Sequence, residues 1–300
     1  EHESHLQPGD QFPFTYGVLT DELSGRTDGI LKRCLETDTC PKIMHTDTAS
    51  EFWQARASLV MTDTSGNGIE LPDNVRAYLM ASTPHSEGFG EVPYETSYCQ
   101  NLANPLQHGG PMRALLHAVH AWVSEDVDPP HSEWPSHADG TLVSRERLGD
   151  GFPAIPGAEF PHALNGLRVT DHSIQPPTEG AAYPVFVPTV DADGNEIPGI
   201  RLPHVSVPVA TYTGWNLAKA GYAEGSLCSV IGSALPFAQS GADRDATGDP
   251  RPSIEERYAT KEAYLQAIEQ AAKALVKKRL LLAEDVSLYL ELASERDIGL

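Results

Sequence analysis

The chain has 300 residues, of which 40% are hydrophobic, and its 42 acidic and 21 basic side chains give a net charge of −21. A single core stops growing near ~250–300 residues, so the length fits one large domain or a domain with an extension. The negative field repels phosphate backbones and anionic lipid surfaces, which argues against nucleic-acid and membrane partners. No apolar run approaches the ~18 residues of a membrane-spanning helix.

The first half of the chain predicts an alternation of strands and helices. Residues 1–40 are turn-rich and lead into a helical turn near residues 28–34. The run PKIMHT at 41–46 predicts a strand buried on both faces, and NVRAYLMAST at 74–83 predicts a second strand. Residues 112–123 predict a helix with one apolar stripe, formed by Met112, Leu115, Leu116, Val119, Trp122 and Val123. This order of elements is typical of an α/β fold.

The second half differs in composition. It is rich in proline and polar residues from Ser124 onward, so we place a boundary near residues 124–130. The segment around DADGNE alternates apolar and polar residues and predicts a β-hairpin. Its acids resemble the start of a calcium loop, but that loop requires Gly and Glu where Glu196 and Leu202 stand, so we do not expect calcium.

Two helices are predicted at the C-terminus, separated near residues 281–284. Ser253 stands three residues before Glu256, which is the spacing of a capping box at a helix start. The apolar face of the longer helix is expected to comprise Tyr264, Ile268, Ala271 and Leu275.

The four cysteines contain no C-x-x-C pair, so a zinc ribbon or a thioredoxin motif is not indicated. Cys34 and Cys40 could close a small surface loop by a disulfide, or they could be two free thiols. The pairing of Cys99 and Cys228 is left open by the sequence.

Polar residues that directly follow the two predicted strands are the first candidates for chemistry, because ligands gather at the carboxyl ends of parallel strands. The letters KIM of the first strand are followed by His45, Asp47 and Glu51, and His85 follows the second strand within a few residues. A serine becomes a useful nucleophile when an imidazole takes its proton and a carboxylate orients that imidazole. We therefore assign His85 as base and Glu51 as orienting acid, with Asp47 as the competing acid. The alternatives are a surface-loop histidine and an acid that stabilises a helix start.

The nucleophile is the missing part of this assignment. No G-x-S-x-G motif occurs in the 300 residues, and the nearest imitation, FAQSGA with Ser240, follows no predicted strand. Ser240 also comes after the acid and the base, which is the wrong chain order, so we interpret it as a loop serine.

Several blocks resemble, in order, the large family of alpha/beta hydrolase domain proteins: TDGILKRC, CPKIMHTDTASEFW, LPDNVRAYLMASTPH, NPLQHGGPMRALLHAVHAWV, VPVATYTGWN and GDPRPSIEERY. A further block of the resemblance is FPFTYG at residues 12–17, and in that family a G-x-S-Q-S-G nucleophile elbow precedes it. The resemblance therefore implies that the chain is the C-terminal part of a hydrolase whose serine, oxyanion hole and first strands lie upstream. It maps Glu51 of SEFW and His85 of STPH onto the acid and the base.

Other polar and aromatic side chains have two readings. Phe52 and Trp53 are expected to wall a substrate pocket, although an aromatic residue after a strand is often part of the core. His117 and His120 are spaced like metal ligands, but they lack a carboxylate or cysteine at ligand spacing and fit a solvated helix face better.

We therefore expect an α/β protein in which residues 1–123 are the C-terminal part of an α/β-hydrolase sheet. Residues 124–300 would be a Pro-rich extension with a β-hairpin and two C-terminal helices. The expected function is hydrolysis of a small-molecule ester through an acyl-serine intermediate, with no cofactor and no metal. The resemblance and the Cys34 and Cys40 pair favour an extracytoplasmic location.

Two alternatives to this function remain open. The chain could be a non-catalytic binding module, or a metal-dependent enzyme that uses His45, Asp47 and His85. Without upstream strands, an apolar sheet edge would be exposed, so we expect the chain alone to aggregate, to bind a nonpolar dye and to lack activity.

Overall fold

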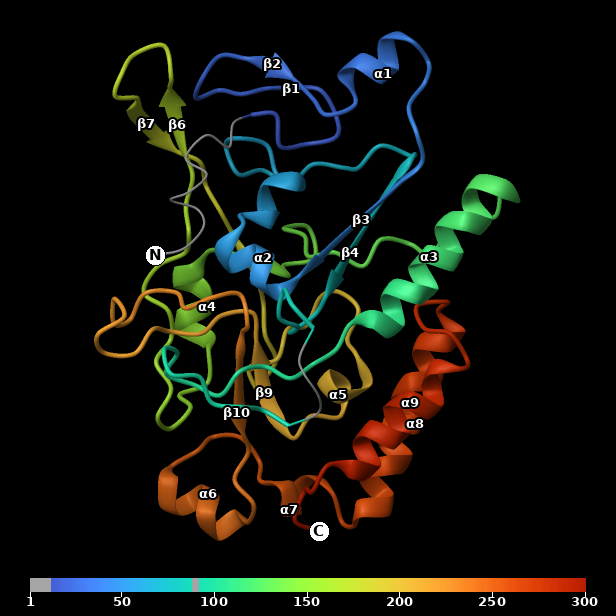
Figure 1. Ribbon diagram of the computed structural model, residues 1–300, viewed down its shortest axis with the longest axis vertical. Coiled ribbons are helices and arrows are strands. Elements are labelled where there is room, and N and C mark those ends of the chain that lie inside the picture. The colour runs from blue at the N-terminus through green and yellow to red at the C-terminus, as the bar shows by residue number, and fades with distance from the viewer. Residues whose placement is uncertain (1–11, 88–91) are drawn as a thin grey trace.

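A parallel pair of strands lies at the centre of the computed structural model, which describes residues 12–87 and 92–300 (Figure 1). β3 (Ile43–Thr48) pairs in parallel with β4 (Val75–Met80), in a register that places Ile43 opposite Val75 and Thr48 opposite Met80. Both predicted strands are confirmed. Because parallel strands end at the same edge of a sheet, the segments that follow β3 and β4 are brought together there.

The two strands differ in burial. β4 is almost entirely buried, whereas β3 is half-buried from Ile43 to Asp47. Parallel bridges to residues 133 and 200 cover the second edge of β4. Across residues 12–87 and 92–300, β3 pairs with no strand except β4. The prediction that residues 41–46 are buried on both faces is wrong, because residue 41 is exposed and residues 42–46 are only half-buried.

α3 (Gly109–Ser124) confirms the predicted helix and begins three residues before the predicted start. Leu115 and Trp122 of the predicted apolar stripe are buried, as expected. Three other members of the stripe are exposed: Met112, Leu116 and Val123. The packed face instead includes the small residues Ala114 and Ala118, and the single predicted stripe is wrong in this respect.

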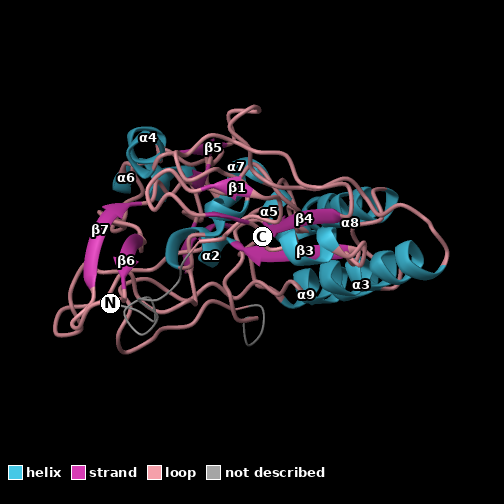
Figure 2. Cartoon of the chain, turned by 90° about the horizontal axis from the view of Figure 1, so that it is seen from above, coloured by secondary structure: helices cyan, strands magenta, loops and turns pink. Residues whose placement is uncertain are grey.

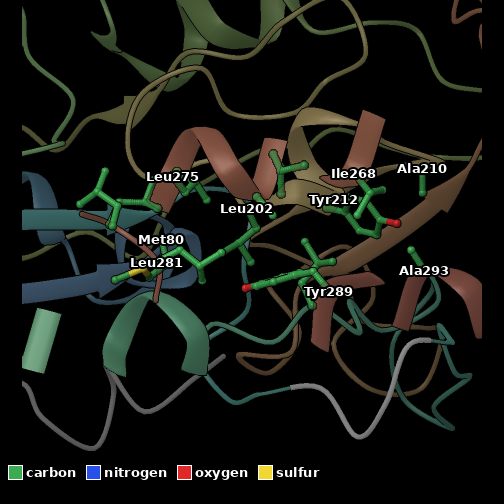
Figure 3. Packing of buried hydrophobic residues seen from close by; sticks show 14 of the residues in the cluster. Met80, Leu202, Ala210, Tyr212, Ile268, Leu275, Leu281, Tyr289 and Ala293 are labelled. Carbon is green, nitrogen blue, oxygen red and sulfur yellow. The ribbon is translucent and has the colours of Figure 1, made fainter. Parts of the chain in front are cut away.

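The C-terminal helices are α8 (Lys261–Lys277) and α9 (Asp285–Glu295), preceded by the short α7 (Ile254–Arg257) with the predicted capping box. Figure 3 shows their apolar side chains packing with those of β4 and of the strand that carries Tyr212. Ala272 rather than Ala271 is fully buried on α8. Burial of each large aliphatic side chain contributes ~1.5–3 kcal/mol to folding.

The predicted hairpin is present around the DADGNE segment. Val190 and Glu196 form an antiparallel bridge across a turn in which Gly194 has a φ of +81°. A Cβ at Gly194 would lie 2.9 Å from the side chain of Thr211, so glycine suits both the turn and the space. The Asp191 carboxylate accepts backbone amides of the turn and pairs with Arg201 at 2.7 Å, so its oxygens stabilise the turn.

The remaining elements are short and surround the central pair. They are β1 (Leu19–Thr20), β2 (Thr27–Asp28), α1 (Lys32–Glu36), α2 (Ala49–Gln54), the 3₁₀ helix at Ala57–Val60, β5 (Leu142–Val143), α4 (Arg145–Gly151), β6 (Arg168–Asp171), β7 (Thr178–Ala182), β8 (Val187–Pro188), α5 (Pro203–Ser206), β9 (Ala210–Thr213), β10 (Ser233–Pro236) and α6 (Gly241–Thr247).

The long helices α3, α8 and α9 lie together at one end of the molecule, and β6 and β7 lie at the other (Figure 2). None of the helices in the described part of the chain is both long and apolar enough to span a bilayer. The proposed boundary near residues 124–130 stays a prediction, although residues 133 and 200 of the second half hydrogen-bond directly to β4.

Candidate functional site

The carboxyl ends of β3 and β4 bring Glu51 and His85 into contact. Glu51 is the third residue of α2, which begins directly after β3, and His85 lies in the loop after β4. The ring Nδ1–H of His85 donates a hydrogen bond to Oε1 of Glu51, since an ionised carboxylate can only accept. The Glu51 side chain is 14% exposed and the His85 side chain is 59% exposed. The imidazole therefore faces solvent, whereas the carboxylate that it contacts is largely shielded from solvent.

The second oxygen of Glu51 fixes the start of α2. Oε2 accepts a hydrogen bond from the amide of Thr48 at 2.7 Å and another from the Thr48 hydroxyl. These contacts form a capping box, which satisfies an amide that the first turn of a helix leaves unpaired. Glu51 is therefore a helix-start acid and the partner of His85 at the same time. The spacing T-x-x-E at residues 48–51 is a sequence signal for this rigid placement.

The backbone of His85 is held by the buried side chain of Ser50. The amide of His85 donates to the carbonyl of Val230 at 3.0 Å and lies 3.2 Å from Oγ of Ser50. The Ser50 hydroxyl donates to the carbonyl of Gly214 at 2.9 Å, and a Cβ at Gly214 would collide with the backbone of α2. Ser50 was not among the predicted site residues, because its partners lie far away in the chain.

Asp47 and His45 form a separate pair. Nε2–H of His45 donates to Oδ2 of Asp47 at 2.9 Å, and Nδ1 of His45 lies 2.9 Å from the hydroxyl of Tyr16. Burial and the charge of Asp47 raise the pKa of Tyr16 above its usual value. The pair borders a cavity of about 330 Å³ that also reaches Glu51. Asp47 is therefore hydrogen-bonded to His45, and Glu51 is the acid that is hydrogen-bonded to His85.

The metal alternative required His45, Asp47 and His85 to converge. The structure instead pairs the first two with each other and directs His85 to Glu51. No group of three or more His, Cys, Asp or Glu side chains within residues 12–87 and 92–300 is placed to hold a metal ion. His117 and His120 lie on the exposed face of α3, as expected for a solvated surface.

Phe52 and Trp53 are core residues in the structure. They are 1% and 2% exposed, and they pack with Trp134 and Trp215 in a buried aromatic cluster. This packing agrees with the alternative interpretation, in which an aromatic residue that follows a strand is part of the core. The expected pocket wall is not formed by these two side chains, because α2 turns both of them toward the interior.

His108, at the N-terminus of α3, is a further histidine close to the pair. Burial lowers its pKa, while the charges of Glu87 and Glu51 act in the opposite direction and His85 adds to the lowering. Its Nδ1 is buried without a hydrogen-bond partner among the described residues. Burial thus favours the neutral form of the His108 imidazole, and no local sequence pattern singled this residue out.

The described residues supply no activated nucleophile. Cys34 pairs with Cys40 and Cys99 pairs with Cys228, so no thiol is free. Ser240 caps α6, and its hydroxyl donates to Oδ2 of Asp243 at 2.6 Å. The structure therefore gives this hydroxyl a capping role and, among the residues that it describes, no partner that would activate it as a nucleophile. Within residues 12–87 and 92–300, no hydroxyl or thiol is hydrogen-bonded to the imidazole of His85.

Comparison with known proteins identifies the family. The sequence model of a family described as an alpha/beta hydrolase domain matches residues 5–291. The match confirms the resemblance that the sequence blocks indicated, and with it the α/β fold class. Searches of the curated proteins and of the solved structures found no match.

Proposed function

The chain belongs to the alpha/beta hydrolase domain family, and from that premise we propose that it cleaves carboxylic esters through an acyl-serine intermediate. The contact between Nδ1 of His85 and Oε1 of Glu51 is the observation that carries the proposal. It leaves Nε2 of an exposed imidazole available to a third group, which is the arrangement of base and orienting acid in a catalytic triad.

The roles follow from this orientation. A serine hydroxyl attacks the ester carbonyl carbon while Nε2 of His85 takes its proton, and the carboxylate of Glu51 stabilises the imidazolium that forms. His85 then returns the proton to the departing alkoxide, which leaves as an alcohol. Water, deprotonated by the same imidazole, attacks the acyl-serine. The imidazolium then returns that proton to the serine oxygen as the carboxylic acid leaves.

We propose that the nucleophile comes from a segment preceding the 300 residues. Two observations support this: no G-x-S-x-G occurs in the sequence, and Ser240 is occupied as a helix cap. The half-buried β3 edge supports it too, because it offers a place for a further strand. The two disulfides support an extracytoplasmic setting.

The test is an ester-hydrolysis assay on the protein extended upstream in its reading frame. We expect the extended protein to hydrolyse short-chain p-nitrophenyl esters, and His85→Ala to lower kcat by at least ~10³-fold. His120→Ala is the matched control, because His120 is an exposed histidine on α3. An extended frame without a serine elbow, or activity that His85→Ala leaves unchanged, would contradict the proposal.

A further inference from the structure

The loop that carries His85 is bound by a buried glutamate from the second half of the chain. The amide of Ser82 donates to Oε2 of Glu196 at 2.6 Å, and the amide of Glu196 donates to Oγ of Ser82 at 2.8 Å. Ser82 is fully buried and Glu196 is 4% exposed. Two residues separated by 114 positions thus form a reciprocal pair of hydrogen bonds.

Ser82 needs such support because its backbone conformation is unfavourable. Its φ is +57°, in the left-handed region that costs a non-glycine residue about 1–2 kcal/mol. The carbonyl of Ser82 accepts a further hydrogen bond from the Asn104 amide at 2.7 Å. Every polar group of Ser82 is therefore bound. Since Ser82 lies three residues before His85, its conformation directs the chain that places the imidazole.

Glu196 also lies close enough to Glu51 for their charges to interact. Burial raises the pKa of Glu196 to about 8, the Ser82 amide and Arg201 act to lower it, and the charge of Glu51 raises it further. An apolar residue would fill the same space without that desolvation penalty. A buried acid beside a candidate site is typical of functional rather than packing roles.

We propose that Glu196 is a positioning residue, whose carboxyl group fixes Ser82 in its left-handed conformation and so holds His85 within hydrogen-bonding reach of Glu51. The inference rests on the proposed function, in which the contact between His85 and Glu51 serves catalysis. Glu196 touches neither the imidazole nor a substrate. It acts through Thr83 and Pro84, the two residues that separate Ser82 from His85.

The test reads the position of the His85 side chain rather than activity. The protein extended upstream is labelled with ¹⁵N-histidine, and the ring-nitrogen resonances of His85 are assigned by their loss in His85→Ala. Glu51→Ala supplies the reference for an imidazole without its acceptor. We expect Glu196→Leu to move the His85 resonances toward that reference by more than their line width. Glu196→Gln should leave them in place, because the amide oxygen still accepts from Ser82.

Asp285→Asn is the matched control for loss of a buried acid elsewhere. Asp285 is also buried and pairs with Arg113, but it contacts neither the loop nor α2. We expect this variant to lose stability and to keep the wild-type His85 resonances. The same resonances in a folded Glu196→Leu variant would overturn the proposal and reduce Glu196 to a packing contact.

If Glu196→Leu does not fold, Glu196→Met decides the question. Methionine is unbranched and similar in length to glutamate, and it lacks the carboxyl oxygen that accepts from the Ser82 amide. Displaced His85 resonances would support the proposal, and unchanged ones would overturn it. Because this readout needs no turnover, a positioning effect in a protein without ester hydrolysis would support the inference while contradicting the proposed function.

Discussion

The buried carboxyl group of Glu196 makes a quantitative prediction about stability and pH. Burial raises its pKa from 4.5 to about 8 in the folded protein, with the charge of Glu51 adding to the rise and the Ser82 amide and Arg201 opposing it. Glu196→Gln keeps the size of the side chain and an acceptor oxygen, but it cannot ionise. The unfolding free energy of the variant should therefore lack the pH dependence that ionisation of Glu196 causes in the wild type.

The sign follows from proton binding. Below pH 4.5, Glu196 is protonated in both the folded and the unfolded chain, so the carboxyl group makes its full contribution there. Between 4.5 and about 8 the unfolded chain loses this proton while the folded chain keeps it, so stability falls as pH rises. At ~1.36 kcal/mol per pKa unit, the shift from 4.5 to about 8 amounts to about 5 kcal/mol.

The assay is urea unfolding of the protein extended upstream, as wild type and as Glu196→Gln, at a series of pH values from 4 to 9. The quantity of interest is the difference in unfolding free energy relative to its value at pH 4. This subtraction removes the pH-independent effect of the substitution and the titration of groups common to both proteins. We expect the variant to gain as much as about 5 kcal/mol over the wild type by pH 8 to 9.

A flat difference across this range would refute the reasoning, because it would mean that Glu196 ionises in the folded protein at its ordinary pKa. Glu262→Gln is the matched control. Glu262 lies in the first turn of α8 at the protein surface, and hydrogen bonds lower rather than raise its pKa. Its substitution should not produce a gain in stability with rising pH.

Three further predictions concern stability. Replacing Cys99 and Cys228 by serine should lower the unfolding free energy by about 5 kcal/mol in urea melts, since that disulfide closes a loop with a sequence separation of 129; an unchanged midpoint would contradict it. Ser50→Ala should cost about 1–3 kcal/mol in the same assay, because it removes a buried hydroxyl that binds the loop of His85. Leu116→Ser should change stability by less than about 0.5 kcal/mol, because the side chain is 68% exposed; a large loss would show that the exposed face of α3 is covered.

The parts of the fold that the sequence predicted are those determined by local patterns. β3, β4 and α3 follow from apolar runs and helical spacing, and the start of α7 follows from a capping box. The hairpin turn follows from Gly194, whose positive φ favours glycine. Each of these features needs only a few neighbouring residues, so their positions were predicted to within a few residues.

The burial of β3 and α3 depended on neighbours that lie far along the chain. The bridges from β4 to residues 133 and 200 have no local signature. The apolar spacing of α3 could not show which of its faces is packed, because the exposed side chains of Leu116 and Val123 are as apolar as the buried ones. The apolar spacing therefore predicted the helix correctly, but three of the six side chains that it assigned to the buried face are exposed.

The residues of the candidate site also fall into those that local sequence order selects and those that only long-range contacts define. The order of acid and histidine after consecutive strands selected Glu51 and His85, and parallel strands bring such residues to one edge. Ser50 and Glu196 could not be selected, because each hydrogen bond that gives them a role spans 35 residues or more. A buried polar side chain has no periodic signal in sequence.

The choice between Glu51 and Asp47 tests the central claim most directly. Asp47 lies in β3 and Glu51 lies in the helix that follows β3. Only Glu51 contacts His85, whereas Asp47 is bound to His45. In the protein extended upstream, kcat for short-chain ester hydrolysis should fall by about 10⁴-fold in Glu51→Gln and remain within a few-fold of wild type in Asp47→Asn. Full activity in Glu51→Gln, or the larger loss in Asp47→Asn, would contradict the assignment of Glu51 as the acid that orients His85.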